Sequence, residues 1–164
     1  MYKRQTGLFD SGSTHALCLT TVQSSDFDAM VALRIAALRE SLERLGRFDP
    51  VRARERLAVG FVPEFMNHIE LDGKRVGFIT LRPVGRALSL DHLYILPAAQ
   101  GRGIGAWALD WAKTQATERS CDISLYALQE SDANRFYVRH GFVKISEAEF
   151  DIEYRWQAHA EVGA

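Results

Sequence analysis

The stretch of sequence that decides the fold is Leu93-Tyr94-Ile95-Leu96-Pro97-Ala98-Ala99-Gln100-Gly101-Arg102-Gly103-Ile104-Gly105-Ala106. An apolar strand ends at a proline, a loop with three alternating glycines follows, and a helix-like run begins at once. Glycines leave backbone N–H groups unshielded, and the start of a helix adds unbonded N–H groups and the positive end of the helix dipole. These features predict a binding site for a phosphorylated ligand.

Composition limits the classes of protein to which the chain can belong. At 164 residues, with 47% hydrophobic and 25% charged residues, it suits one ordinary globular domain. A net charge of −1 does not indicate a nucleic-acid partner. No apolar run approaches the ~20 residues of a membrane span. We therefore expect a cytoplasmic protein with one domain over residues 16–160 and no nucleic-acid or membrane partner.

The beginning of the chain and its cysteines carry weaker signals. The stretch from residue 1 to 14 is polar and lacks the apolar core of a signal peptide, so we expect residues 1–15 to form a loose tail outside the fold. Cys18 and Cys121 are far apart in the sequence, and we interpret them as buried free thiols in a reducing compartment. The cysteines and the five scattered histidines show no metal-ligand spacing, so no metal site is predicted.

Periodicity along the chain predicts a strand, two helices, an antiparallel meander, a helix, a strand, a helix and a closing hairpin. Asp72-Gly73-Lys74 predicts a hairpin turn between apolar runs, and Asp49-Pro50 predicts the start of the second helix. We expect strands at 16–22, 65–71, 75–81, 87–96, 123–128, 142–145 and 150–156, and helices at 27–45, 50–59, 105–118 and 131–139. The fold class is α/β of the α+β kind, a mixed, mostly antiparallel central sheet with helices on both faces.

Two general phosphate-binding motifs must be compared with the glycine loop. Its spacing from Gly101 to Ala106 satisfies the dinucleotide fingerprint G-x-G-x-x-G/A. However, residues 97–100 separate the loop from the strand, and the end of the chain indicates an antiparallel hairpin in place of a large parallel sheet. A P-loop is excluded, because no Gly-Lys-Ser/Thr follows at the required spacing.

The sequence also resembles a known family. Residues 93–97 followed by Gln100-Gly101-Arg102-Gly103-Ile104-Gly105 resemble the acetyl-CoA signature Q/R-x-x-G-x-G/A of the GNAT superfamily of N-acetyltransferases. Downstream, Arg135-Phe136-Tyr137-Val138-Arg139-His140-Gly141-Phe142 resembles the closing helix and turn of that family. The resemblance extends from about Leu17 to Trp156. One position departs from the pattern, since Glu130 stands where many members have asparagine.

The resemblance implies a GNAT-like acyl-CoA N-acyltransferase fold with acetyl-CoA as cosubstrate. The glycine loop would bind the pyrophosphate, the strand before it would pair with the pantetheine arm, and the N–H of Ile95 would stabilise the oxyanion of the tetrahedral intermediate. The predicted cofactor-binding residues are Leu93, Tyr94, Ile95, Gln100, Gly101, Arg102, Gly103, Ile104, Gly105 and Ala106.

Two side chains are the candidates for proton transfer. Tyr137 matches the family's general acid, a phenol that protonates the departing thiolate. His92 lies on the strand before the loop, and its imidazole is a candidate base, acting directly or through water. Asp91, Glu40 and Glu70 are weaker candidates, and many relatives are thought to use a chain of waters in place of a dedicated base.

The predicted function is transfer of an acetyl group from acetyl-CoA to a primary amine by direct attack on the thioester. The alternative is a non-catalytic acyl-CoA-binding or sensory module on the same fold. The acceptor, a small molecule or a peptide amine, would bind at the first two helices, most of whose charged residues we interpret as a solvated face. The strand at 150–156 is either an internal closing strand or an edge for a homodimer.

Overall fold

The computed structural model describes residues 7–9 and 15–158, which form two compact units. The first unit contains the described chain up to Thr80 together with His92–Ala108. The second unit contains Leu81–Asp91 together with the chain from Leu109 onward. Three elements pass along the chain from one unit into the other, namely β4 (Lys74–Val84), β5 (Ala87–Ile95) and α3 (Ile104–Glu118).

The sheet of the first unit is antiparallel and follows the chain order. β2 (His15–Thr21) pairs with β3 (Met66–Leu71), and β3 pairs with β4. Asp72 and Gly73 join β3 to β4 with φ values of 52° and 81°. Positive φ at both central residues is the geometry of a tight hairpin turn that Asp-Gly adopts readily. The predicted hairpin is confirmed.

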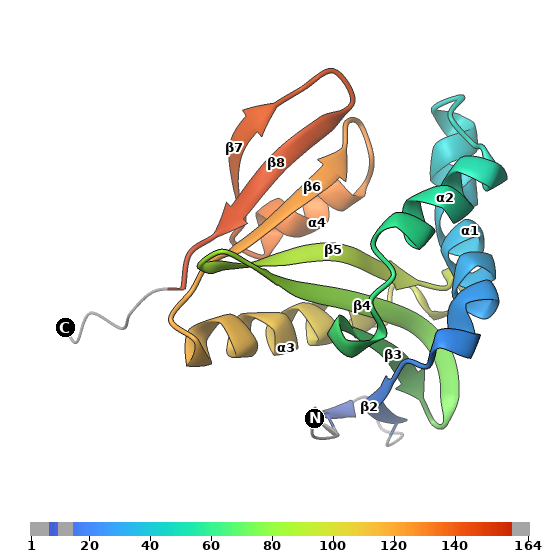
Figure 1. Ribbon diagram of the computed structural model, residues 1–164, viewed down its shortest axis with the longest axis horizontal. Coiled ribbons are helices and arrows are strands. Elements are labelled where there is room, and N and C mark those ends of the chain that lie inside the picture. The colour runs from blue at the N-terminus through green and yellow to red at the C-terminus, as the bar shows by residue number, and fades with distance from the viewer. Residues whose placement is uncertain (1–6, 10–14, 159–164) are drawn as a thin grey trace. The chain divides into compact units, whose positions relative to one another are not determined.

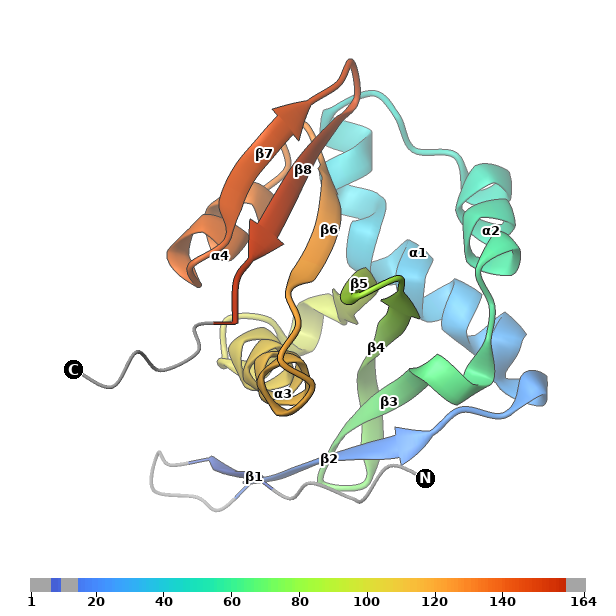
Figure 2. The same ribbon diagram turned by 60° about the vertical axis from the view of Figure 1, so that its left-hand side comes forward.

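The N-terminal segment corrects one expectation. Gly7–Phe9 form a short strand, β1, which lies along the edge of β2 in Figure 2 and pairs with it antiparallel, with Gly7 opposite Leu17. This part of the predicted tail therefore belongs to the sheet. Backbone pairing along an available strand edge needs no amphipathic pattern, which is why three residues carried no recognisable signal. Residues 1–6 and 10–14 lie outside the described part of the chain.

Two helices of the first unit follow β2, namely α1 (Phe27–Arg44) and α2 (Pro50–Val59). The Asp49 side chain accepts hydrogen bonds from the backbone N–H groups of Val51 and Arg52 at 3.1 and 3.3 Å. Pro50 occupies the first helical position, so the predicted start of α2 is confirmed. Short 3-10 turns occupy Ser24–Asp26, Pro63–Phe65 and Pro97–Ala99.

A hydrophobic cluster holds these helices on the strands. It contains Val22, Met30 and Val31 near the start of α1, Leu57 of α2, Met66 of β3 and Phe78 of β4. The buried face of α1 includes a charged residue, because Arg34 is buried whereas Leu33, Leu38 and Leu42 are only half-buried. A cation therefore occupies a core-facing position of this helix.

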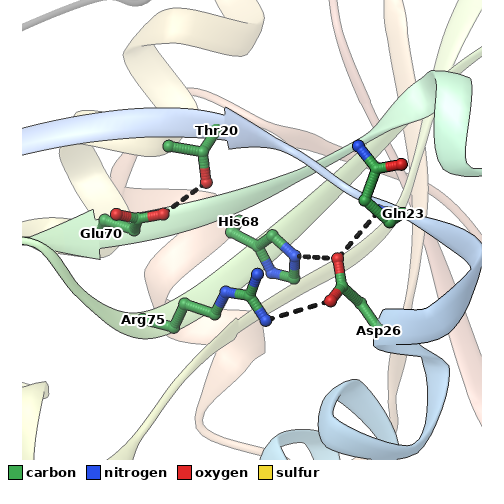
Figure 3. Close-up of polar contacts among 6 residues, drawn as sticks. All are labelled: Thr20, Gln23, Asp26, His68, Glu70 and Arg75. Atoms are coloured by element: carbon green, nitrogen blue, oxygen red, sulfur yellow. Dashed lines mark hydrogen bonds and ion pairs between the residues drawn. The ribbon is translucent and has the colours of Figure 1, made fainter.

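A polar network at Asp26 ties the start of α1 to β3 and β4 (Figure 3). Asp26 Oδ2 accepts the Gln23 N–H at 2.8 Å and lies 2.9 Å from Nε2 of His68, whose side chain is buried. Asp26 Oδ1 accepts a hydrogen bond from Arg75 Nη1 at 3.2 Å. The Gln23 N–H contributes most, followed by His68, to lowering the pKa of the Asp26 carboxyl to about 2.

The second unit contains a smaller mixed sheet. β5 pairs in parallel with β6 (Ile123–Leu128), and β6 pairs antiparallel with β8 (Asp151–Trp156). β8 in turn pairs antiparallel with β7 (Val143–Glu147). The short helix α4 (Ala133–Arg139) lies against β6 (Figure 1). The expected closing hairpin is therefore confirmed.

The parallel pairing of β5 with β6 is short. The parallel ladder joins Leu88 to Ile123 and Ser89 to Ser124. β5 continues within the second unit through Leu90 and Asp91, which have no partner in this ladder. A single parallel pair among otherwise antiparallel strands confirms the predicted fold class, a mixed and mostly antiparallel sheet. Neither Cys18 nor Cys121 forms a disulfide, as expected, but both thiols are half-buried, so the prediction that they are buried is wrong.

Gly77 of β4 is the position at which a side chain should be least tolerated. An added Cβ would lie 2.2 Å from Tyr94 O and 2.9 Å from Ile95 Cδ1. Rotation of a side chain cannot relieve a clash with a backbone oxygen. We expect Gly77→Ala to lower the free energy of unfolding by about 1–3 kcal/mol, the usual cost of overpacking, as measured by chemical denaturation.

Gly60→Ala is the matched control. Gly60 has a φ of −114°, and no atom lies within 4 Å of the position of its added Cβ. Its free energy of unfolding should change by no more than about 0.5 kcal/mol, the ordinary range for a surface site. Equal stability of the two variants would show that β4 and β5 do not approach each other as closely as described.

Asp26 should make stability depend on acid pH. Its folded-state pKa of about 2 lies below the ordinary value of 3.8. The carboxylate therefore stabilises the fold fully above pH ~4, and this contribution is lost as the pH falls from about 4 to about 2. We expect Asp26→Asn to lower the free energy of unfolding near neutral pH by about 1–3 kcal/mol and to flatten its fall over that acid range.

Asp28→Asn provides the comparison for this experiment. Asp28 has a side chain that is 80% exposed and pairs with Arg54 at 2.8 Å. Exposed ion pairs contribute about 0–1 kcal/mol, so this variant should keep the acid-dependent fall of the wild type. Both variants are measured by denaturation curves at several pH values. If the free energy of unfolding of Asp26→Asn falls between pH ~4 and pH ~2 as steeply as that of the wild type, Asp26 is not the group responsible for the fall.

Candidate functional site

The glycine loop lies in the first unit, between β5 and α3. Gly101 and Gly103 have φ values of 74° and 76°, in the left-handed region that glycine adopts readily. Gly101, Arg102 and Gly103 are all exposed. The first turn of the helix closes with the Trp107 N–H bonded to Gly103 O at 3.0 Å, so the N–H groups before it have no partner within the helix. The loop therefore offers exposed backbone donors at the positive end of α3.

Gln100 has a role that sequence reasoning did not specify. Its Nε2 donates a hydrogen bond to Ile95 O at 2.9 Å, which ties the start of the loop back to the last residue of β5. The side chain is thereby used to hold the strand and the loop in one arrangement. The predicted residues from Leu93 to Ala106 are all part of the first unit and form one continuous strand, loop and helix start.

The peptide group between Tyr94 and Ile95 has a defined direction. Tyr94 O lies against Gly77 of β4, at the place that a Cβ would occupy. None of the described peptide bonds is cis, and in a trans peptide the N–H points opposite to the C=O. The N–H of Ile95 therefore points away from β4. This is the donor that the family resemblance implies for the thioester oxygen.

Three polar side chains form a hydrogen-bonded chain beside β5. Arg34 Nε donates to Tyr94 Oη at 3.2 Å, and Tyr94 Oη lies 3.2 Å from His92 Nδ1. Because a guanidinium can only donate, Tyr94 Oη accepts from Arg34 and has its own hydrogen left for Nδ1. In the tautomer of His92 that carries its proton on Nε2, Nδ1 is the acceptor of this hydrogen bond.

Sequence reasoning missed Arg34 and used Tyr94 only for its backbone. Arg34 is 7% exposed, and its Nη1 also donates to Ala53 O of α2 at 2.7 Å. Its guanidinium carbon lies 5.4 Å from the centre of the Tyr94 ring. The signal that could have found Arg34 is its spacing along the helix. It follows Val31 by three residues and Met30 by four, so all three lie on one face of the helix. An arginine on the core-facing side of a helix is unusual unless it is paired.

Two weaker base candidates have other partners. Asp91, in the second unit, accepts hydrogen bonds from Arg82 Nε at 2.8 Å and from Ser89 Oγ at 2.6 Å. The bond to Asp91 raises the pKa of Arg82. Glu70, in the first unit, accepts from Thr20 Oγ1 at 2.6 Å (Figure 3). Both carboxylates therefore already accept hydrogen bonds from neighbouring side chains.

Glu40 is also a weak candidate, because it lies exposed on α1. Charged residues nearby behave as a solvated face, since Arg39 pairs with Glu43 at 2.9 Å with both side chains more than half exposed. Among the predicted bases, His92 is thus the one joined to the Arg34 and Tyr94 chain.

Tyr137 belongs to the second unit and is buried in an aromatic cluster. Its ring centre lies 5.5 Å from that of Phe142 and 6.4 Å from that of Tyr154. Phe142 N donates to Tyr137 O at 3.0 Å, so the Gly141-Phe142 turn closes onto the helix that carries the phenol. This is the local structure that the family motif predicts around its general acid.

The start of α4 differs from expectation. Ser131 Oγ donates back to Leu128 O at 2.7 Å, and the helix begins at Ala133. Asn134 Nδ2 donates to Leu128 O at 2.9 Å, while Asn134 Oδ1 accepts from Tyr154 Oη at 2.8 Å. The asparagine of this region therefore joins α4 to β6 and β8, whereas Glu130 occupies a left-handed position with a φ of 66°.

His140 closes α4 and carries a lowered pKa. Burial contributes most to this shift, and the Lys113 ammonium adds to it. Burial also lowers the pKa of Lys113, whose Nζ donates to His140 O at 2.5 Å. His140 is therefore neutral near pH 7 and adds no charge to this end of the second unit.

The first unit also contains a cavity of about 330 Å³ beside the start of α1. Neither His92 nor any residue from Gln100 to Ala106 lines this cavity, so it is separate from the predicted cofactor-binding loop and from the candidate base. The lining residues are Ala29, Met30, Ala32, Leu33, His68, Arg75 and Leu96.

Two searches of the described residues gave negative results. No group of three or more histidine, cysteine, aspartate or glutamate side chains is arranged to hold a metal ion within residues 7–9 and 15–158. In the same ranges, no helix combines the length and the apolar character needed to cross a membrane.

Comparison with known families identifies the domain. The model of the acetyltransferase (GNAT) domain matches residues 65–144, from the start of β3 into β7. The matched segment contains both motifs that carry the resemblance in sequence. The chain therefore carries a GNAT acetyltransferase domain. No curated protein sequence matches the chain.

Solved structures show the same fold at low sequence identity. The PaiA N-acetyltransferase of Thermoplasma acidophilum, solved in complex with coenzyme A, has a TM-score of 0.72 at 14% identity, covering 86% of this chain and 98% of that one. An acetyltransferase of Thermus thermophilus has a TM-score of 0.68 at 18% identity, covering 86% and 96%. The Escherichia coli ribosomal-protein-S18-alanine N-acetyltransferase has a TM-score of 0.64 at 14% identity, covering 90% and 98%. These similarities establish the GNAT fold.

Proposed function

We propose that the protein transfers an acetyl group from acetyl-CoA to a primary amine by direct attack of the amine on the thioester. The observation that carries this proposal is the direction of the Ile95 N–H, which points away from β4 on the strand that leads into the glycine loop. Family membership adds that GNAT domains use acyl-CoA.

The residues present fit the phosphates of coenzyme A. Gly101 and Gly103 are exposed and adopt positive φ, and an added Cβ at Gly101 would meet no atom within 4 Å. A phosphate can therefore approach the backbone without a side chain in the way. We assign the pyrophosphate to the N–H groups of this loop and of the first turn of α3, with Arg102 available for a charge-assisted contact.

The strand before the loop suits the pantetheine arm. Extended amide chains pair with exposed strand edges, and the peptide N–H of Ile95 points away from the β4 side of β5. Placed on the thioester carbonyl, this N–H would stabilise the negative charge that develops on oxygen when the amine attacks. Gly77 supports the function indirectly, because it allows β4 to approach Tyr94 O.

The base is proposed to be His92 acting through Tyr94. The attacking nitrogen forms a bond to the thioester carbon and must lose one proton. In the proposed step, Tyr94 Oη takes that proton while its own hydrogen passes to His92 Nδ1, which leaves an imidazolium beside a neutral phenol. The observed 3.2 Å contact between Oη and Nδ1 supports this relay.

The acid is proposed to be Tyr137. When the tetrahedral intermediate collapses, the carbon–sulfur bond breaks and the sulfur takes a proton from the Tyr137 hydroxyl. The aromatic cluster of the second unit holds the phenol on α4, next to the Gly141-Phe142 turn. A non-catalytic acyl-CoA-binding module would need no such donor.

Binding of coenzyme A is tested at the loop. Gly103→Asp should abolish binding measured by isothermal titration calorimetry, because its carboxylate would repel the pyrophosphate and its side chain would crowd the loop. Gly85→Asp is the control, since Gly85 also has a positive φ, 59°, and lies in the turn between β4 and β5. Unchanged affinity of Gly103→Asp would contradict the assignment of the loop.

Catalysis is tested with Tyr137→Phe, using thiol detection of coenzyme A release across a panel of amines, amino acids, aminoglycosides and peptides. The variant should keep its affinity for coenzyme A, whereas kcat should fall by about 10²-fold, the usual contribution of a general acid. Tyr154→Phe is the control, since its hydroxyl bonds Asn134 in the same aromatic cluster. Wild-type turnover by Tyr137→Phe would exclude the acid role, and binding without turnover of any amine would favour the non-catalytic module.

A further inference from the structure

Arg34 is a buried cation whose partners are all neutral. It is 7% exposed, and its hydrogen bonds go to Ala53 O at 2.7 Å and Tyr94 Oη at 3.2 Å. The Tyr94 ring adds a cation–π contact at 5.4 Å. Within residues 15–158, no ion pair joins this guanidinium to a carboxylate. Its Nη2 makes no hydrogen bond to a described residue and is not fully buried, because the fully buried side-chain atoms without a partner are Asn67 Nδ2 and Thr80 Oγ1.

Two other arginines of the same helices form exposed ion pairs with carboxylates. Arg39 lies 2.9 Å from Glu43 and 5.0 Å from the centre of the Phe48 ring, with a side chain that is 61% exposed. Arg54 lies 2.8 Å from Asp28 and is also exposed. Arg39 thus has a carboxylate, an aromatic ring and solvent, whereas Arg34 has only the ring and two neutral acceptors.

The chemistry of a buried guanidinium indicates what is missing. Moving a cation out of water is costly, and neutral hydrogen bonds with a cation–π contact offset only part of that cost. A carboxylate forms short, charge-assisted bonds with a guanidinium and would offset the remainder. The described chain supplies no such group at Arg34, so a carboxylate at this position would have to come from a bound molecule.

A second buried group on the same part of the first unit also lacks a partner. Thr80 Oγ1, on a residue that is 1% exposed, makes no hydrogen bond to any described residue. Thr80 stands two residues after Phe78, so both face the same side of β4. The Phe78 ring contacts the rings of Tyr94 and His92, with centres 5.4 and 6.1 Å apart. An unbonded hydroxyl therefore shares this face with the Arg34, Tyr94 and His92 chain.

We infer that the acceptor is an amine that also bears a carboxylate, such as an α-amino acid, and that Arg34 binds the carboxylate. This inference rests on the proposed function, because it names the substrate class of that site. Tyr94 connects the two roles, since its hydroxyl contacts Arg34 on one side and the proposed base His92 on the other. Binding the carboxylate at Arg34 would bring the amine of the same molecule toward the relay.

The decisive experiment compares each acid with its own amide. Common α-amino acids and short ω-amino acids are assayed beside their carboxamides, with coenzyme A release as the readout. The acids should have kcat/KM values about 10- to 100-fold higher, the range that a charge-assisted hydrogen bond supplies. Equal kcat/KM for acids and amides would overturn the inference and leave the proposed acetyl transfer intact.

Two variants show whether Arg34 is responsible. Arg34→Met keeps much of the side-chain volume and should remove the preference for acids while leaving the KM for acetyl-CoA unchanged. Arg39→Met, the same substitution at the paired and exposed arginine of α1, should keep the preference. A preference that survives in Arg34→Met would contradict the assignment. If Arg34→Met does not fold, Arg34→Lys replaces it, with the preference reduced but not lost.

A binding measurement keeps the inference separate from catalysis. Calorimetry with the coenzyme A-loaded protein should detect the preferred amino acid and its N-acetyl product, and Arg34→Met should lose both. If no amine is acetylated, the proposed function fails, yet carboxylate binding that depends on Arg34 would still support the site. Absence of binding and of any preference for acids would disprove it.

Discussion

The close approach of β5 to β4 at Gly77 is the constraint on which the proposed active site depends. Tyr94 O occupies the space that a Cβ would need, so the peptide between Tyr94 and Ile95 has one direction. Its N–H then points away from β4, toward the side of β5 that the pantetheine arm would use. In the proposed reaction, the missing side chain at Gly77 thus allows the strand to present a donor for the oxyanion.

The first unit offers two positively polarised sites of different construction. The glycine loop is exposed and uses backbone N–H groups at the start of α3, which suits a large phosphorylated ligand that stays in contact with water. Arg34 is buried and uses a full charge held between α1, α2 and β5. A buried charge discriminates more strongly, because an acceptor without a matching anion would leave it unpaired. The loop therefore suits the acyl donor, which is common to the family. Arg34 suits discrimination among the amines that could receive the acetyl group.

Local signals predicted most elements correctly. Asp72-Gly73 and Asp49-Pro50 determine a turn and a helix start within a few residues, and both form as expected. The short β1 was missed because its pairing with β2 depends on a neighbouring strand edge. The burial of Arg34 on α1 was also missed, because the packing of this helix buries Arg34 and leaves Leu38 and Leu42 only half-buried.

The sequence by itself determined the glycine loop, the order of elements and the family, because these depend on short segments whose backbone preferences are local. Only the tertiary structure decided which side chains meet at the loop's strand. Arg34 and Tyr94 are 60 positions apart, and their contact forms only when α1 packs over β5. The direction of the Ile95 N–H likewise follows from β4 lying against Tyr94 O. Burial, and not spacing, makes Arg34 a candidate for binding the acceptor.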